Sequence, residues 1–153
     1  MSQRIYLLDT SVMLPLVRGN ALGKHIDRRF GLRSAAQRPF VSVVSLGEVR
    51  VLAKRNDWGD AKLRALSNAL DNLVVVDINH PAVIDAYVEL DLVSQSHPGG
   101  ARNMGKNDLW IAACAKAAGA VLLTTDNDFT HLIPDYLDGE VIDPAVARPD
   151  DSE

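Results

Sequence analysis

The chain has 153 residues, a length that favours one domain, and its 47% hydrophobic and 24% charged residues are ordinary for a folded core. A single cysteine, Cys114, excludes an internal disulfide framework. No apolar run is long enough for a signal peptide or a membrane span, so we expect a cytoplasmic protein. The net charge of −4 is uneven, because residues 123–153 hold nine acidic side chains and one basic, and the residues before them carry a surplus of four positive charges. A polyanionic ligand is therefore compatible with the composition.

Short apolar runs alternate with amphipathic segments along the chain, which predicts strands that alternate with helices. In chain order we expect a strand at 4–8, helices at 10–18 and 21–37, a strand at 40–44, helices at 45–56 and 60–70, a strand at 73–78, helices at 80–96 and 107–118, and strands at 121–123 and 140–142. The segment 97–106 reads as a loop rich in glycine and basic residues. We expect one domain over residues 1–146, followed by a frayed acidic tail at 147–153.

This order of elements indicates a three-layer α/β/α fold, in which a mostly parallel sheet lies between two layers of helices. Functional sites in such sheets gather outside the carboxyl ends of the strands. Asp9 and Asp126 directly follow strands, and Asp108 lies in the first turn of the helix that leads to the strand before Asp126. Because that helix and that strand span similar distances, Asp108 should return to the same edge of the sheet.

Each acidic residue at this edge also has a purely local interpretation. Asp9 could simply begin a helix, and Ser45 and Glu48 have the spacing of a capping box, in which the glutamate bonds the serine backbone N–H. Asp108 could only favour the positive end of its helix. The segment 126–128, with an aspartate on each side of an asparagine, could be a plain turn.

Taken together, the acidic residues favour a metal site over these local roles. The set consists of Asp9, Glu48, Asp108 and Asp126, with Asp128 as an additional candidate. Two carboxylates 4 Å apart repel by about 4 kcal/mol at an effective dielectric constant of 20, so the cluster needs either bound protons or a cation. The four histidines are scattered and no CxxC pattern is present, which speaks against zinc. A set of oxygen ligands suits Mg²⁺ or Mn²⁺, and such a metal can activate water for attack on phosphorus.

Four segments in this order resemble the PIN domain and, more narrowly, the VapC-type toxins of bacterial toxin–antitoxin pairs. The segments are LLDTS at 7–11, SLGEV at 45–49, KNDLWIAA at 106–113 and LLTTDNDF at 122–129. The resemblance implies a parallel sheet with helices on both faces and RNA cleavage that depends on Mg²⁺ or Mn²⁺.

The same resemblance implies roles for single residues and for partners. The acidic positions of the family fall on Asp9, Glu48, Asp108 and Asp126, and Ser11 occupies a polar position that helps to order the metal site. A small VapB-like antitoxin that blocks the pocket is the implied partner, and a homodimer is the implied assembly.

Two basic residues precede Asp108 in the glycine-bearing loop. Arg102 and Lys106 should rim the acidic pocket, where they could hold RNA phosphates, although a solvated loop explains their charges equally well. The leading interpretation is a metal-dependent endoribonuclease. Two rivals stay open: a phosphatase that uses Asp9 as its nucleophile, and a PIN-like RNA-binding or scaffold domain without catalysis.

Overall fold

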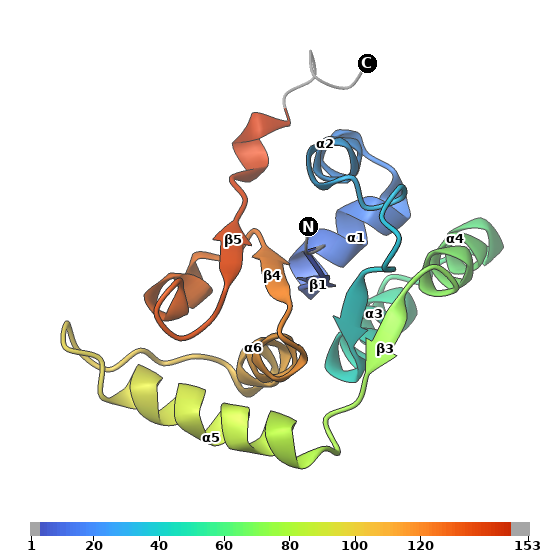
Figure 1. Cartoon of the computed structure of the whole chain (residues 1–153). Helices are drawn as coiled ribbons and strands as arrows, with labels where there is room; N and C mark the ends of the chain where they lie inside the picture. Colours follow the sequence, from blue (N-terminus) through green and yellow to red (C-terminus); the bar gives the residue numbers. More distant parts are fainter. Residues whose placement is uncertain (1–3, 148–153) are drawn as a thin grey trace.

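The computed structural model describes residues 4–147, and it has the α/β fold expected from the sequence (Figure 1). The five strands are β1 (Tyr6–Leu8), β2 (Phe40–Ser42), β3 (Val74–Val76), β4 (Val121–Thr124) and β5 (Gly139–Val141). They form one sheet in the order β3-β2-β1-β4-β5, and every neighbouring pair is parallel. The tail expected after the domain lies outside the described residues, apart from Ala147.

Helices cover both faces of this sheet. They are α1 (Thr10–Arg18), α2 (Ala21–Phe30), α3 (Val43–Arg55), α4 (Asp60–Leu70), α5 (Pro81–Gln95) and α6 (Lys106–Ala118), with two short 3₁₀ helices, η1 (Asn127–Leu132) and η2 (Pro144–Val146). In Figure 1, α5 and α6 run along one side of the sheet, and α1 and α2 lie on the other. Within residues 4–147, no helix combines the length and the apolar composition that crossing a bilayer requires.

The strand side chains alternate between two cores, one on each face of the sheet. Leu7 and Leu122 pack with apolar residues of α5, α6 and η1. Leu8 and Leu123 pack with residues of α1, α2, α3 and α4. All four leucines are fully buried, as expected for parallel strands covered on both faces. The two cores hold the carboxyl ends of β1 and β4 side by side, with Leu8 in register with Leu123.

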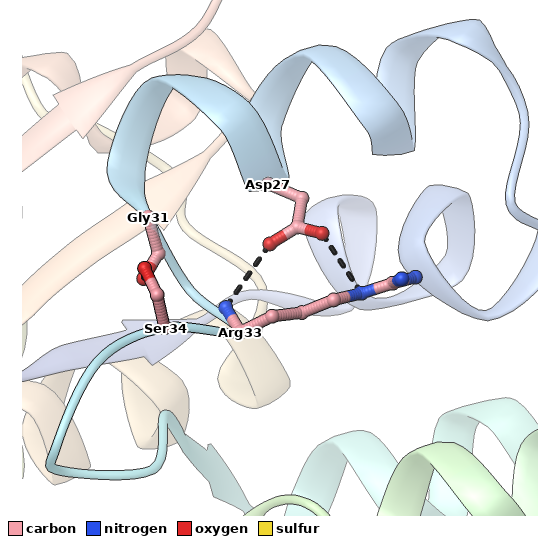
Figure 2. A network of polar contacts seen from close by, with 4 residues as sticks. All are labelled: Asp27, Gly31, Arg33 and Ser34. Atoms are coloured by element: carbon pink, nitrogen blue, oxygen red, sulfur yellow. Dashed lines mark hydrogen bonds and ion pairs between the residues drawn. The ribbon is translucent and has the colours of Figure 1, made fainter.

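The second helix is shorter than predicted, because α2 ends at Phe30 and not near residue 37. Gly31 adopts a left-handed conformation, with φ +60°, which glycine tolerates and which stops the helix. Asp27 then fixes the turn: its carboxylate accepts the Arg33 backbone N–H at 3.1 Å and lies 2.8 Å from Arg33 Nε (Figure 2). The amphipathic pattern alone did not reveal this stop.

Two predicted helix starts are also wrong. Helix α3 begins at Val43, and its cap is Ser42, whose hydroxyl accepts the Val44 N–H at 3.1 Å. The capping box that was the local alternative for Ser45 and Glu48 is therefore not formed. Helix α6 begins at Lys106, one residue before the expected start at 107.

Candidate metal centre

The carboxylate of Asp9 is buried at the carboxyl end of β1, with only 4% of the residue exposed. Its backbone N–H donates to the carbonyl of Leu123 at 2.9 Å, which ties it to β4. Its Oδ2 atom accepts hydrogen bonds from Ser11 Oγ and Thr124 Oγ1, each at 2.7 Å. Although Asp9 stands at the start of α1, its side chain makes no capping hydrogen bond. Its carboxylate is thus held by hydroxyl groups and does not serve to start the helix.

Those two hydroxyl groups also position the loop after β4. Ser11 Oγ accepts the backbone N–H of Thr125 at 3.0 Å, and Thr124 Oγ1 accepts the backbone N–H of Asp126 at 3.0 Å. Each hydroxyl therefore donates to Asp9 and accepts from the loop. This network fixes Asp126 relative to Asp9, although more than 100 residues of chain separate them.

Three aspartates gather beside this network. Asp108, Asp126 and Asp128 each offer a carboxylate oxygen, and these three oxygens lie within 4.8 Å of one another. Asp108 projects from the first turn of α6. Asp126 caps η1, where its Oδ1 accepts the backbone N–H of Asp128 at 2.9 Å. The residues 126–128 therefore do form a local turn, as the local interpretation expected. The turn leaves the second oxygen of Asp126 available for a ligand.

The pKa of Asp108 responds to every other carboxylate of the predicted acidic set. Its pKa is raised from the ordinary value of 3.8 to about 7, first by burial and then by repulsion from Asp9, Asp126, Glu48 and Asp128. Burial likewise raises the pKa of Asp9, against the lowering effect of its two hydroxyl donors. The predicted acidic residues thus share one electrostatic site, and a cation there would relieve their repulsion.

Glu48 reaches this site from α3. Its Oε1 accepts the Thr10 hydroxyl at 2.6 Å, and its Oε2 accepts Asn107 Nδ2 at 3.4 Å. Thr10 Oγ1 also lies 2.8 Å from Ser45 Oγ. Glu48 and Asp9 are not part of the tight group of three aspartates, although both raise the pKa of Asp108. The side chain of Glu48 is therefore held between α1 and α6, beside the three aspartates.

Arg102 and Lys106 are both exposed. Arg102 helps to line a hollow of about 260 Å³, together with Asn127, Asp128 and His131 of η1. The Arg102 backbone N–H donates to the Ser94 carbonyl at 2.7 Å, which anchors the loop to α5. Lys106 is the first residue of α6, two positions before Asp108. Neither side chain forms an ion pair among residues 4–147.

Sequence reasoning missed three residues that hold the acidic side chains. Thr10 and Asn107 bind Glu48, and Thr124 binds Asp9. All three lie inside segments that already contained a candidate carboxylate: DTS, KND and TTD. Their polar side chains next to strand ends and a helix start were the available signal.

The model of the PIN domain family matches residues 6–133, most of the chain. The chain belongs to the PIN domain family. A comparison with curated proteins found no match.

Solved structures share the fold of this PIN domain. VapBC2 from Rickettsia felis, bound to a DNA fragment from its promoter, is 24% identical with a TM-score of 0.70, covering 90% of this chain and 98% of that chain. VapBC-1 from nontypeable Haemophilus influenzae is 23% identical with a TM-score of 0.71, covering 90% and 97%. A toxin–antitoxin complex from Klebsiella pneumoniae is 20% identical with a TM-score of 0.63, covering 91% and 97%. At these identities, the similarity establishes the fold alone.

Proposed function

We propose that this PIN domain is a metal-dependent endoribonuclease and the toxin of a type II toxin–antitoxin pair. The observation that carries the proposal is the group formed by Asp108, Asp126 and Asp128 at the carboxyl edge of the sheet. Asp9 and Glu48 add two further carboxylates that act electrostatically on Asp108. This edge is where parallel α/β sheets place their functional sites.

The residues present fit a hard divalent cation. Every candidate ligand is a carboxylate oxygen, which suits Mg²⁺ or Mn²⁺ and does not suit zinc. We infer that Asp108, Asp126 and Asp128 hold the ion, together with Asp9 and Glu48. When bound, such an ion lowers the pKa of an attacking water and stabilises the negative charge that develops on a phosphodiester, which would yield a 5′-phosphate and a 3′-hydroxyl.

The remaining residues prepare the site for this ion and for the substrate. Ser11 and Thr124 keep the Asp9 carboxylate in one orientation, and Thr10 does the same for Glu48. Asp108 has a pKa near 7, so cation binding at neutral pH would release its proton.

Arg102 and Lys106 are the candidates for contact with RNA phosphates beside the acidic group. Both are exposed and lack an ion pair within residues 4–147, so their charges are available to a phosphate. The contacts would position the RNA backbone and would not take part in the chemistry.

The proposed partners follow from the related structures. Because the Klebsiella structure is a toxin–antitoxin complex, we propose that a VapB-like antitoxin binds this chain and blocks its acidic pocket. We also propose a homodimer. RNA and an antitoxin would both be met in the cytoplasm, where we expect the protein to act. A short neighbouring reading frame with a DNA-binding N-terminus would support this assignment.

The test is cleavage of end-labelled single-stranded RNA by the purified protein in Mg²⁺, in Mn²⁺ and in EDTA. We expect internal cleavage with either metal and products that carry a 5′-phosphate. A covalent aspartyl-phosphate trapped on Asp9 would instead support the phosphatase rival, which the burial of Asp9 disfavours. RNA binding without cleavage in either metal would support the non-catalytic rival.

A further inference from the structure

A groove of about 640 Å³ leaves the acidic site along one side of α3. At one end it is lined by Thr10, Glu48 and Asn107, the residues that border the acidic group, and at the other end by Arg55. Arg55 lies seven positions after Glu48 in α3, which corresponds to about 10 Å at 1.5 Å per residue. The groove therefore connects the acidic site to a positive charge further along α3.

The wall of this groove contains a helical glycine that no packing contact explains. Gly47 lies inside α3, where glycine is less stable than alanine. Apart from its chain neighbours and the backbone of its own helix, a Cβ atom at Gly47 would meet no atom within 4 Å, and the φ of Gly47 is not positive. Gly23, the other helical glycine among residues 4–147, has a packing reason, because its Cβ would approach the Pro15 carbonyl oxygen to 2.2 Å. Gly47 therefore leaves room for a ligand to approach the backbone of α3 closely.

The floor and the far end of the groove suit a strand of nucleic acid. Val43 and Val51 are 36% and 53% exposed, which gives the groove an apolar surface. Arg55 forms no ion pair among residues 4–147, and so its guanidinium is available to a phosphate. Arg50 and Lys54 add positive charge on the adjoining side of α3.

We propose that single-stranded RNA occupies this α3 groove, with a nucleotide next to the scissile phosphate packed on Val51 over Gly47 and a more distant phosphate held by Arg55. The inference rests on the proposed ribonuclease function and assigns part of its substrate path. RNA is favoured over a protein segment because the groove joins a site for a phosphate-activating cation to an unpaired arginine. Arg102 lines a separate hollow together with Asp128, so a strand that continued past the acidic site could also contact Arg102.

The test compares an RNA oligonucleotide with bis-p-nitrophenyl phosphate, a small phosphodiester that cannot reach Arg55. Gly47→Leu fills the groove, and Arg55→Ala removes its charge. The matched controls are Ala61→Leu, an exposed helical position on α4, and Arg18→Ala, an exposed arginine that, like Arg55, lies in the last turn of its helix. Gly47→Ala is a further variant, which should melt at a higher temperature than the wild type because it removes a helical glycine.

We expect the ratio of kcat/KM for RNA to kcat/KM for the small diester to fall about tenfold or more in Gly47→Leu and Arg55→Ala. Gly47→Ala should lower the same ratio less while raising stability, which would exclude misfolding as the cause. Both controls should keep the wild-type ratio. If the wild type cleaves RNA but the ratio is unchanged in Gly47→Leu and Arg55→Ala, the α3 groove is not part of the RNA path. The proposed ribonuclease function would be unaffected by that result. The groove would likewise be rejected as an RNA path if Gly47→Leu changed only the mass of the protein in solution, because it would then be a contact between copies.

Discussion

Thr124 donates a 2.7 Å hydrogen bond to Oδ2 of Asp9 and accepts the backbone N–H of Asp126 at 3.0 Å. One fully buried hydroxyl thereby joins two acidic positions of the proposed metal centre. Thr124→Val keeps the shape of the side chain but removes both hydrogen bonds. We expect it to lower the free energy of unfolding by about 1–3 kcal/mol and to reduce RNA cleavage.

Thr124→Ser is the matched control for this hydroxyl, because it keeps the donor and acceptor and loses only a methyl group. It should retain most of the cleavage rate that Thr124→Val loses. Urea denaturation and kcat/KM on one RNA, measured for both variants, give the comparison. Equal activity in Thr124→Val and wild type would mean that the orientation of Asp9 is set elsewhere.

Substitutions of Glu48 and Ser42 should affect different properties of the protein, RNA cleavage for Glu48 and the stability of α3 for Ser42. Ser42 caps α3, whereas Glu48 accepts hydrogen bonds from Thr10 and Asn107. Glu48→Gln should therefore change stability by only a few tenths of a kcal/mol, as for substitutions away from caps, while cleavage is largely lost. Ser42→Ala should cost about 1 kcal/mol of stability. A Glu48→Gln variant with full activity would remove Glu48 from the proposed metal centre.

Asp108 should make the metal-free protein less stable as the pH rises. Its pKa is about 7 in the folded protein and 3.8 ordinarily, so between these values the folded state binds a proton that the unfolded state has lost. The free energy of unfolding in EDTA should then fall from about pH 4 to pH 7 and change little above that range. Asp108→Asn lacks this titration and should have a flatter profile.

At pH 8 in EDTA, Asp108→Asn should be more stable than the wild type by about 1–2 kcal/mol, after allowance for screening by solvent at this half-buried position. At pH 4 the difference should be small, because Asp108 is then mostly protonated in the folded wild type. Denaturation curves at several pH values test both statements. Parallel profiles for the two proteins would contradict the raised pKa.

Arg102 and Lys106 should affect binding more than chemistry. If they contact phosphates, the double variant Arg102→Ala with Lys106→Ala should weaken RNA binding and flatten its salt dependence by up to about one unit of log–log slope per contact. Filter binding with Ca²⁺ in place of the active metal, across several salt concentrations, measures both effects. The solvated-loop interpretation predicts the wild-type affinity and slope throughout.

The sequence predicted the fold because each strand carried a clear local signal. A sheet covered by helices on both faces requires strands with consecutive apolar residues, such as Leu7 and Leu8 in β1 or Leu122 and Leu123 in β4. The end of α2 was missed because the amphipathic pattern continues past Gly31, and only the left-handed conformation of that glycine stops the helix. The cap of α3 was misplaced because a serine at 45 fits a capping box as well as a serine at 42 fits a simple cap.

The candidate site was predicted only in part, for a physical reason. Asp9 and Asp126 follow strands, so the topology of a parallel sheet brings them to one edge. The hydrogen bonds of Thr10 and Thr124 depend on side-chain directions in the folded protein, and threonine is common at strand ends and in turns. Sequence reasoning could therefore locate the carboxylates but could not identify the hydroxyl groups that orient them.

We propose that the acidic group holds a cation that RNA cleavage requires. The most direct measurement is the single-turnover rate of RNA cleavage as a function of Mn²⁺ concentration, for the wild type and for Asp126→Asn. We expect no cleavage in EDTA, a rate that saturates with Mn²⁺ in the wild type, and a curve in Asp126→Asn that is shifted to higher Mn²⁺ or abolished. Cleavage by the wild type at the same rate in EDTA would contradict a metal-dependent mechanism, and identical curves for the two proteins would contradict a role for Asp126 in holding the metal.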